Sequence, residues 1–218
     1  ILVTWGTMDI RPLHKNAPKL KWIHALSAGV ESLLFPEMQA KNTLLTNSRG
    51  IHGIPISEHV LAMMLAFTRG LNVFIRQQTK KEWKRSPVEE IHDKTIGIVG
   101  LGSIGREIAK KAKGMGMHVI ASKRTMTTEL FIDKLYGPDQ LHELLAISDF
   151  VVVSLPLVEE TKNFFTLKEF SSMKSSAYFI NVSRGAVVKE DDLIAALTKG
   201  LIKGAGLDVF DHEPLPST

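Results

Sequence analysis

Cysteine is absent from the 218 residues of the sequence. Its absence excludes disulfide bonds, cysteine nucleophiles and thiolate metal sites, and we expect no metal centre. Long hydrophobic runs are also missing. The longest uninterrupted apolar stretch, Val60 to Phe67, is far shorter than the roughly 20 residues that cross a bilayer. No signal-peptide pattern opens the chain. These absences predict a soluble, cytoplasmic protein with no membrane partner.

Charge of one sign is not concentrated anywhere in the sequence. The 27 Lys and Arg residues and the 23 Asp and Glu residues leave a formal net charge of +4, and they are spread along the chain. Proteins that bind nucleic acids electrostatically more often carry a dense basic stripe. We therefore expect no nucleic-acid partner. Hydrophobic residues make up 44% of the chain and charged residues 23%, which is typical of one or two globular domains.

Short β-branched runs alternate with helix-type stretches from about residue 92 onward. Such strands, apolar on both sides, predict a parallel sheet covered by helices on both faces, a doubly wound Rossmann-type α/β domain. Thr166 with Glu169 fits a capping box, and Gly200 is placed to end a helix. The expected strands are Thr95–Val99, His118–Ala121, Phe150–Leu155, Ala177–Val182 and Gly206–Phe210, and the expected helices are Ile104–Lys113, Gln140–Ile147, Leu167–Met173 and Asp191–Lys199.

The first 54 residues have the pattern of a smaller α/β unit. Its strand-like runs are Leu2–Trp5, Trp22–Leu26 and Thr43–Thr46. The stretch Gly53-Ile54-Pro55-Ile56 then predicts a stiff connector and hinge, because it contains two helix breakers. This divides the chain into domains of residues 1–54 and 55–218. After the connector, Ser57 is placed to cap one long helix from Glu58 to about Arg76.

The strongest local motif is Gly100-Leu101-Gly102-Ser103-Ile104-Gly105, which follows an expected strand and opens an expected helix. Gly100 permits the tight turn, Gly102 lets backbone approach a pyrophosphate, and Gly105 lets the helix pack closely on the strand. The amide groups of Ser103 and Ile104 would face the diphosphate at the positive end of the helix dipole. The alternative is a glycine-rich turn with no ligand, but this context favours NAD(P).

The acid that usually follows the second strand of an NAD site is missing. Lys123 stands in its place, with Ser122 before it and Arg124 after it. Two cations and a hydroxyl suit a ribose 2′-phosphate, because a dianion gains charge-assisted hydrogen bonds from them. The sequence therefore favours NADP over NAD. The alternative is that both cations are ordinary solvated surface charges.

Seven short motifs occur in the order and spacing of one family. They are Ser27-Ala28-Gly29-Val30, Asn47-Ser48-Arg49-Gly50, Ser57-Glu58-His59, Gly100 to Gly105, Ser154-Leu155-Pro156-Leu157, Asn181-Val182-Ser183-Arg184-Gly185-Ala186 and Leu207-Asp208-Val209-Phe210-Asp211-His212-Glu213-Pro214. Over essentially its whole length the chain resembles the D-isomer-specific 2-hydroxyacid dehydrogenases, which include phosphoglycerate dehydrogenases and glyoxylate/hydroxypyruvate reductases. The resemblance implies a Rossmann domain, part of a flavodoxin-like substrate domain in residues 1–54, and a homodimer.

The resemblance also implies two catalytic residues. Arg184 matches the arginine that binds the carboxylate and carbonyl of a 2-oxo acid, a role suited to a planar, permanently charged fork. Glu213 matches the glutamate that hydrogen-bonds the family's catalytic histidine and raises its pKa. Without the family, Glu213 would be interpreted as an exposed acid before a proline.

Further contacts follow from the same motifs. The resemblance assigns cofactor contacts to Asp208, Leu155, Pro156 and the backbone of Val182 and Ser183, and backbone contacts with the substrate carboxylate to Ala28 and Gly29. Asp208 would pair with the nicotinamide carboxamide. His59, in the helix-start motif, is interpreted as a structural residue.

The family's proton-donating histidine has no positional match here, because it lies beyond the glutamate and past residue 218. The chain starts without Met and ends in loop-type residues, so we expect a piece of a longer protein. The favoured hypothesis is an NAD(P)-dependent D-2-hydroxyacid dehydrogenase that reduces small 2-oxo acids. The alternative is a non-catalytic, dinucleotide-sensing regulator. A formate dehydrogenase fits less well, because that group has an amide where this chain has Glu213. Which 2-oxo acid is reduced stays open.

Overall fold

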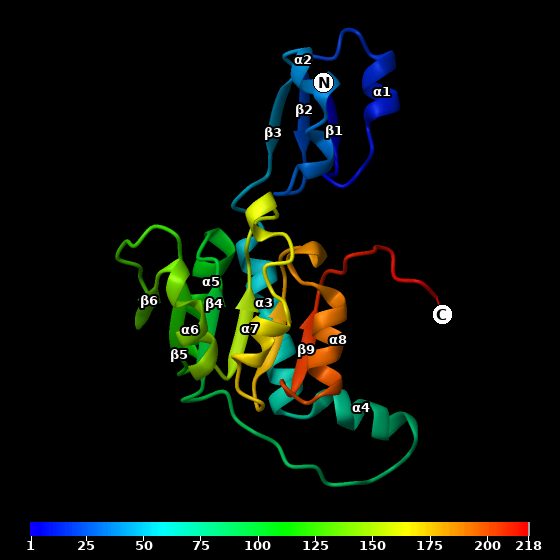
Figure 1. Ribbon diagram of the computed structural model, residues 1–218. Helices are drawn as coiled ribbons and strands as arrows, with labels where there is room; N and C mark the ends of the chain where they lie inside the picture. Colours follow the sequence, from blue (N-terminus) through cyan, green and yellow to red (C-terminus); the bar gives the residue numbers. More distant parts are fainter. Residues whose placement is uncertain (218) are drawn as a thin grey trace. The chain divides into compact units, whose positions relative to one another are not determined.

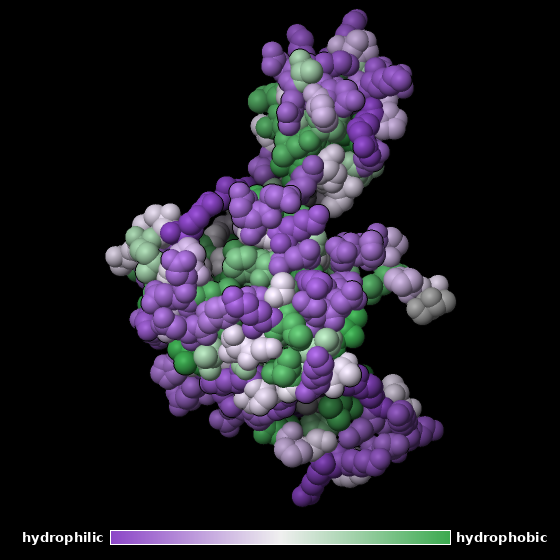
Figure 2. Space-filling view, in the orientation of Figure 1, coloured by the Kyte–Doolittle hydropathy of each residue, from purple (hydrophilic) through white to green (hydrophobic). Residues whose placement is uncertain are grey.

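The computed structural model describes residues 1–217, which form two compact units, Ile1–His52 and a larger unit that begins at Gly53 (Figure 1). Each unit contains its own parallel sheet. Within the described residues, no helix has the length and apolar character needed to cross a bilayer. The face seen in Figure 2 is largely hydrophilic, with apolar side chains scattered between the polar ones.

The smaller unit is a three-stranded parallel sheet in the order β1-β2-β3, formed by the three stretches expected from the sequence. Its core lies between this sheet and two short helices that the sequence did not predict. Both helices have a proline in the first turn, where the missing N–H costs no hydrogen bond. The elements are β1 (Leu2–Thr4), α1 (Arg11–Asn16), β2 (Trp22–Ala25), α2 (Pro36–Ala40) and β3 (Leu44–Asn47).

The larger unit is a six-stranded, entirely parallel sheet in the order β6-β5-β4-β7-β8-β9 (Figure 1). Sequential strands build outward in one direction from β4 and then in the other from β7, which is the doubly wound order. The expected fold class is therefore confirmed. The strands are β4 (Thr95–Val99), β5 (His118–Ser122), β6 (Lys134–Tyr136), β7 (Phe150–Val153), β8 (Tyr178–Asn181) and β9 (Gly204–Leu207).

Helices cover both faces of this sheet. Strand β7 illustrates the alternation, because Val151 and Val153 belong to one core cluster while Phe150 and Val152 belong to the other. Helices α6, α7 and α8 contribute to the first cluster, and α3 and α5 to the second. The helices are α3 (Gly53–Thr68), α4 (Leu71–Thr79), α5 (Ser103–Gly114), α6 (Leu141–Ile147), α7 (Leu167–Ser171) and α8 (Glu190–Thr198).

The expected single helix from Glu58 to Arg76 is wrong at its start and in its middle. Helix α3 begins at Gly53, so the predicted connector is its first turn, where Pro55 gives up no intrahelical hydrogen bond. Ser57 is consequently no cap, and its hydroxyl donates to the Ile54 carbonyl at 2.7 Å. Gly70, with φ +66°, then breaks the helix before α4.

Strand β9 also differs from the prediction, because it begins at Gly204 rather than at Gly206. The predicted strand extended to Phe210 because Val209 and Phe210 are apolar. The observed strand ends at Leu207 and consists mainly of small residues. A β-carbon on Gly206 would lie 2.8 Å from the sulfur of Met63 on α3. Side chains of α3 therefore pack closely over Gly206, and a larger residue there would require Met63 to move. The three-residue strand β6 was not predicted.

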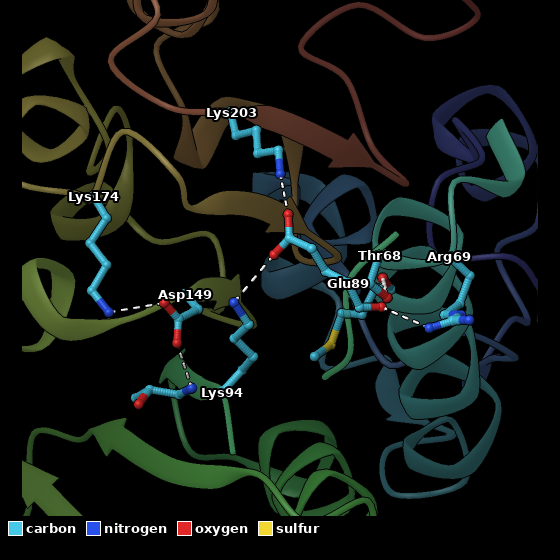
Figure 3. Close-up of polar contacts among 9 residues, drawn as sticks. Thr68, Arg69, Glu89, Lys94, Asp149, Lys174 and Lys203 are labelled. Carbon is cyan, nitrogen blue, oxygen red and sulfur yellow. Dashed lines mark hydrogen bonds and ion pairs between the residues drawn. The ribbon is translucent and has the colours of Figure 1, made fainter. Parts of the chain in front are cut away.

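A network of charged side chains joins the amino ends of several strands (Figure 3). The Asp149 carboxylate accepts the Thr95 amide at 2.8 Å and the Lys174 ammonium at 2.9 Å. The Glu89 carboxylate accepts Lys94 at 3.2 Å and also contacts Lys203. Glu89 thereby fastens the segment that precedes β4 to the sheet.

Replacing Glu89 with Gln should lower the free energy of unfolding at pH 7 by about 0.5–1 kcal/mol, a value for half-exposed, solvent-screened pairs. Lys203, and then Lys94, lower the pKa of the Glu89 carboxyl below 4.5. The stabilisation is thus complete above 4.5 and disappears as the pH falls through the lowered pKa. Urea unfolding from pH 7 down to pH 3 measures this. Glu90→Gln is the control, and an equal loss in both variants would contradict the assignment.

Candidate functional site

The glycine turn lies at the point where the strand order reverses, between the carboxyl ends of β4 and β7. Gly100, with φ +98°, leaves β4, and a β-carbon there would lie 2.8 Å from the Ser154 carbonyl oxygen. The Ser154 hydroxyl donates to the Gly100 carbonyl at 2.6 Å, and the Gly100 amide donates to the Ser122 carbonyl at 3.2 Å. The turn is therefore held from both neighbouring strands, β7 and β5.

The two remaining glycines of the motif have different surroundings. A β-carbon on Gly105 would overlap the Gly100 carbonyl oxygen, so α5 packs against the turn as expected. A β-carbon on Gly102 would meet nothing within 4 Å. Gly102 is the N-cap of α5, which starts at Ser103, and a helix leaves its first amide groups without intrahelical partners. An open surface beside such amides fits a pyrophosphate, so the residues present suit a dinucleotide.

The end of β5 differs from the expectation in one respect. Lys123 does not present a free ammonium group, because it contacts the carboxylate of Glu129 and donates to the Thr127 hydroxyl at 2.8 Å. Arg106 on α5 holds the same carboxylate with two hydrogen bonds of 2.8 Å. Arg106, and then Lys123, lower the pKa of the Glu129 carboxyl to about 2. Arg124 is exposed. Glu129 is a residue that sequence reasoning missed, since contact across a loop leaves no periodic signal.

The predicted coenzyme contacts after β7 lie beside the glycine turn. The Leu155 side chain would be 3.0 Å from a β-carbon on Gly100, and Leu155 also packs against the core. Pro156 follows it and is exposed. Their placement at the carboxyl edge agrees with the general location of ligands in open α/β sheets. Their contact with a coenzyme stays a prediction.

The segment after β8 is fixed by one buried side chain. Asn181, 1% exposed, accepts the amide of Ser183 at 3.0 Å and its hydroxyl at 2.7 Å, and donates to the Arg184 carbonyl at 3.0 Å. Val182 and Ser183 are buried, whereas Arg184 is half-buried. An Arg184 guanidinium nitrogen donates to the Ser183 carbonyl at 2.7 Å. Backbone and side chain of Arg184 are both oriented by this segment.

The segments that carry Arg184 and Glu213 lie against each other. A β-carbon on Gly185 would overlap the backbone of Phe210 and Asp211. The Glu213 carboxylate accepts the Phe210 amide at 2.9 Å, and Glu213 is exposed. The structure thus brings the two predicted catalytic residues to neighbouring segments at the carboxyl edge of the sheet.

Asp208 follows β9, and its amide donates to the Asn181 carbonyl at 3.1 Å. Its carboxylate lies 3.4 Å from Nε2 of His59 on α3, and both side chains are about half exposed. His59 is therefore next to a predicted nicotinamide contact, a neighbour that the sequence interpretation of His59 as a purely structural residue did not include.

The predicted substrate loop belongs to the smaller unit. The Ala28 carbonyl accepts the Asn47 amide group at 2.6 Å, and the Gly29 carbonyl accepts the Ser27 hydroxyl at 2.7 Å. A β-carbon on Gly6 would overlap the Gly29 oxygen, so the loop packs tightly on the segment after β1. These contacts occupy carbonyl groups, which leaves the amide role of Ala28 and Gly29 as a prediction.

A doubly wound sheet with a glycine turn at its switch point defines a dinucleotide-binding α/β domain. Comparison with known families identifies which one. Residues 61–218 match the family model described as "D-isomer specific 2-hydroxyacid dehydrogenase, NAD binding domain". The chain therefore belongs to the D-isomer specific 2-hydroxyacid dehydrogenase family, and the resemblance seen in the sequence is confirmed.

Relatives of known sequence and structure agree with this assignment. A glyoxylate reductase of Thermococcus litoralis is 38% identical, covering 98% of this chain and 67% of the relative. A glyoxylate/hydroxypyruvate reductase B of Pectobacterium carotovorum is 36% identical, covering 99% and 69%. A crystal structure of a family member from Aeromonas salmonicida superposes with a TM-score of 0.91 at 36% identity, covering 99% and 69%.

A second solved relative was crystallised with a coenzyme. It is an NADPH-dependent glyoxylate/hydroxypyruvate reductase of Sinorhizobium meliloti in complex with NADP and sulfate, with a TM-score of 0.84 and 29% identity, covering 99% of this chain and 69% of that one. The chain spans 62–69% of the length of the first four curated relatives.

Alanine substitutions at Gly102 and Gly105 should affect different properties, coenzyme binding in the first case and stability in the second. Gly102→Ala adds a methyl group over open surface, so its melting temperature should stay unchanged, while NADPH binding weakens by about tenfold, or roughly 1.4 kcal/mol. Gly105→Ala forces a clash inside the protein and should lower the free energy of unfolding by about 1–3 kcal/mol. Thermal unfolding and NADPH fluorescence titration measure the two effects. Unchanged binding in Gly102→Ala would contradict the position of the pyrophosphate.

Proposed function

We propose that this chain provides the coenzyme site and the substrate-anchoring arginine of an oxidoreductase that transfers a hydride between NAD(P)H and a small 2-oxo acid, giving a D-2-hydroxy acid. The observation that carries the proposal is the close packing of Gly185 against the backbone of Phe210. It gathers the segments of Arg184 and Glu213 at the same edge of the sheet as the glycine turn. A dinucleotide bound at that turn would extend along this edge.

Each residue has a physical task in this reaction. Reduced nicotinamide, when bound, supplies the hydride. Arg184 binds the substrate carboxylate and carbonyl oxygen as a fork and stabilises the negative charge that develops on that oxygen. Glu213, by family resemblance, orients a histidine that donates the proton and lies C-terminal to residue 218. Asp208 holds the nicotinamide carboxamide. The open surface at Gly102 leaves room for the pyrophosphate of the same coenzyme.

The coenzyme we favour is NADP(H). Ser122, Lys123 and the exposed Arg124 place a hydroxyl and two cations where an NAD site usually has an acid, with Lys123 paired to Glu129. A solved relative from Sinorhizobium meliloti is in complex with NADP, and one from Xanthobacter autotrophicus is in complex with NADPH. Binding of NAD(H) stays compatible with the rest of the site.

The substrates we propose are glyoxylate and hydroxypyruvate, because the Thermococcus and Pectobacterium relatives carry these names. Residues 1–54 would contribute part of the substrate domain, with the amides of Ala28 and Gly29 on the substrate carboxylate. None of the relatives named above is a regulator, and no structural observation favours the sensing hypothesis. A cytoplasmic location is proposed with this activity, since a chain without cysteine suits a reducing compartment.

We also propose a homodimer, formed through α4 and the segment after it. Trp83 is 95% exposed, and Leu71 and Ile75 on α4 are exposed by 48% and 59%. A hollow of about 830 Å³ lies among these elements, lined by Phe74, Trp83 and Val88 with several polar side chains. Exposed aromatic and aliphatic side chains around a hollow are typical of a protein interface.

Arg184→Ala should lower kcat/KM for glyoxylate and hydroxypyruvate with NADPH by roughly 100-fold, since each charge-assisted hydrogen bond contributes about 1.5–3 kcal/mol. NADPH binding itself should be retained. Steady-state kinetics of the full-length protein, with Arg11→Ala on α1 as the control, measures the effect. An unchanged kcat/KM in Arg184→Ala would remove the assigned role.

Trp83→Ala should weaken the dimer by about 30-fold or more, because a buried tryptophan at an interface commonly contributes about 2 kcal/mol. Sedimentation equilibrium over a range of protein concentrations gives the dissociation constant. Ile194→Ala, at a 60% exposed position on α8, is the matched control and should leave the dimer unchanged. A wild-type protein that is monomeric at all concentrations would refute the proposed interface.

A further inference from the structure

The acid missing from the end of β5 is supplied by the loop that follows. Glu129 lies between β5 and β6 in sequence, yet its carboxylate contacts Lys123 at the end of β5 and Arg106 in the first turns of α5. Its side chain is 8% exposed, compared with 21% for Lys123. A carboxylate is therefore already paired with the cation on which recognition of a 2′-phosphate would depend.

The two oxygens of this carboxylate accept hydrogen bonds from different numbers of donors. Oε1 accepts from Arg106, Lys123 and Thr127, whereas in the part of the chain that the structure describes Oε2 accepts only the Arg106 Nε hydrogen, at 2.8 Å. A carboxylate oxygen has room for a second donor. A ribose 2′-hydroxyl that reached Oε2 would find an acceptor there, which is the contact an NAD site normally obtains from its strand-end acid.

The same carboxylate opposes a ribose 2′-phosphate. A phosphate that reaches Lys123 meets a negative charge already paired with that ammonium, so it must displace Glu129 or share the cation with it. The Glu129 carboxyl is ionised at physiological pH, as an ordinary glutamate is, and Arg106, followed by Lys123, lowers its pKa further, to about 2. The competition is therefore permanent.

We propose that Glu129 determines the coenzyme preference of the site: it competes with the 2′-phosphate of NADP(H) for Lys123 and offers an acceptor for the 2′-hydroxyl of NAD(H). This inference rests on the proposed dinucleotide site, and it makes the preference for NADP(H) weaker than the residues Ser122, Lys123 and Arg124 alone predict. Glu129 acts on binding and has no part in hydride transfer.

The test uses two small ligands that differ only in the group concerned, adenosine 2′,5′-bisphosphate and adenosine 5′-monophosphate. Their dissociation constants are measured by isothermal titration calorimetry on the full-length protein without substrate. Glu129→Gln keeps the size of the side chain and removes its charge. It should strengthen binding of the bisphosphate relative to the monophosphate by about threefold to tenfold, the range for one partly exposed charge contact.

Asp133→Asn is the matched control. Asp133 lies in the same loop and pairs with Lys113 at 2.6 Å, so this variant makes the same change in net charge near a different lysine. It should leave the ratio of the two dissociation constants unchanged. In a Lys123→Met background, Glu129→Gln should also have little effect, because the contested cation is gone.

Three results would overturn the inference. A ratio unchanged in Glu129→Gln would show that the carboxylate does not compete. A weaker bisphosphate affinity would make Glu129 a residue that positions Lys123 for the phosphate. An equal increase in Asp133→Asn would reduce the effect to net charge. If Glu129→Gln does not fold, Glu129→Asp, which is one methylene shorter and should weaken the contacts with Lys123 and Arg106, should give a smaller increase, and no increase would refute the inference. If the wild-type protein binds neither ligand, the proposed dinucleotide site itself fails.

Discussion

The close approach of three backbone segments at the switch point is the constraint on which the site depends. The turn after β4 receives a hydrogen bond from the Ser154 hydroxyl, donates one to the Ser122 carbonyl, and has α5 against its own carbonyl at Gly105. Side chains larger than hydrogen are excluded from two of the three motif glycines by these contacts, while Gly102 faces open space. The packing of the turn leaves one surface uncovered, and that surface carries the free amides of the helix.

The amino ends and the carboxyl ends of the strands in the larger sheet carry different kinds of residue. At the amino ends of the strands, Glu89 and Asp149 pair with lysines and hold the strand beginnings together (Figure 3). At the carboxyl ends, loops instead present Arg184, Asp208 and the glycine turn. This division follows from parallel strands, which place all their carboxyl ends on one edge, and it allows the ligand-facing loops to vary without loss of the core.

Much of the fold and part of the candidate site could be predicted from local sequence signals. The Thr166 and Glu169 capping box forms with its hydroxyl and carboxylate bonds, and Gly200 ends its helix with φ +66°. These features need only neighbouring residues. The break at Gly70 was missed because glycine inside an apolar pattern does not by itself stop a helix. The start of β9 was missed because Gly204, Ala205 and Gly206 carry no strand signal of their own, and their pairing with β8 is a tertiary contact.

Contacts across loops had no local signal either. Glu129 sits on Lys123 because residues 123–133 fold back toward α5, and nothing in the residues near 123 indicates it. The approach of the segment that carries Arg184 to the segment that carries Glu213 is a tertiary contact, made by Gly185 against Phe210 and Asp211. Motif order predicted the family and the candidate residues, whereas tertiary contact decides which charges remain available to a ligand.

The buried amide of Asn181 has a consequence for how a substrate would be captured. Because it binds the backbone on both sides of Ser183, the conformational entropy of the loop under Arg184 is lost when the protein folds, before any ligand arrives. In the proposed role of Arg184, a substrate carboxylate would not have to order that loop when it binds the guanidinium. In that role, the uncharged amide of Asn181 would contribute to binding of a charged ligand that it does not touch.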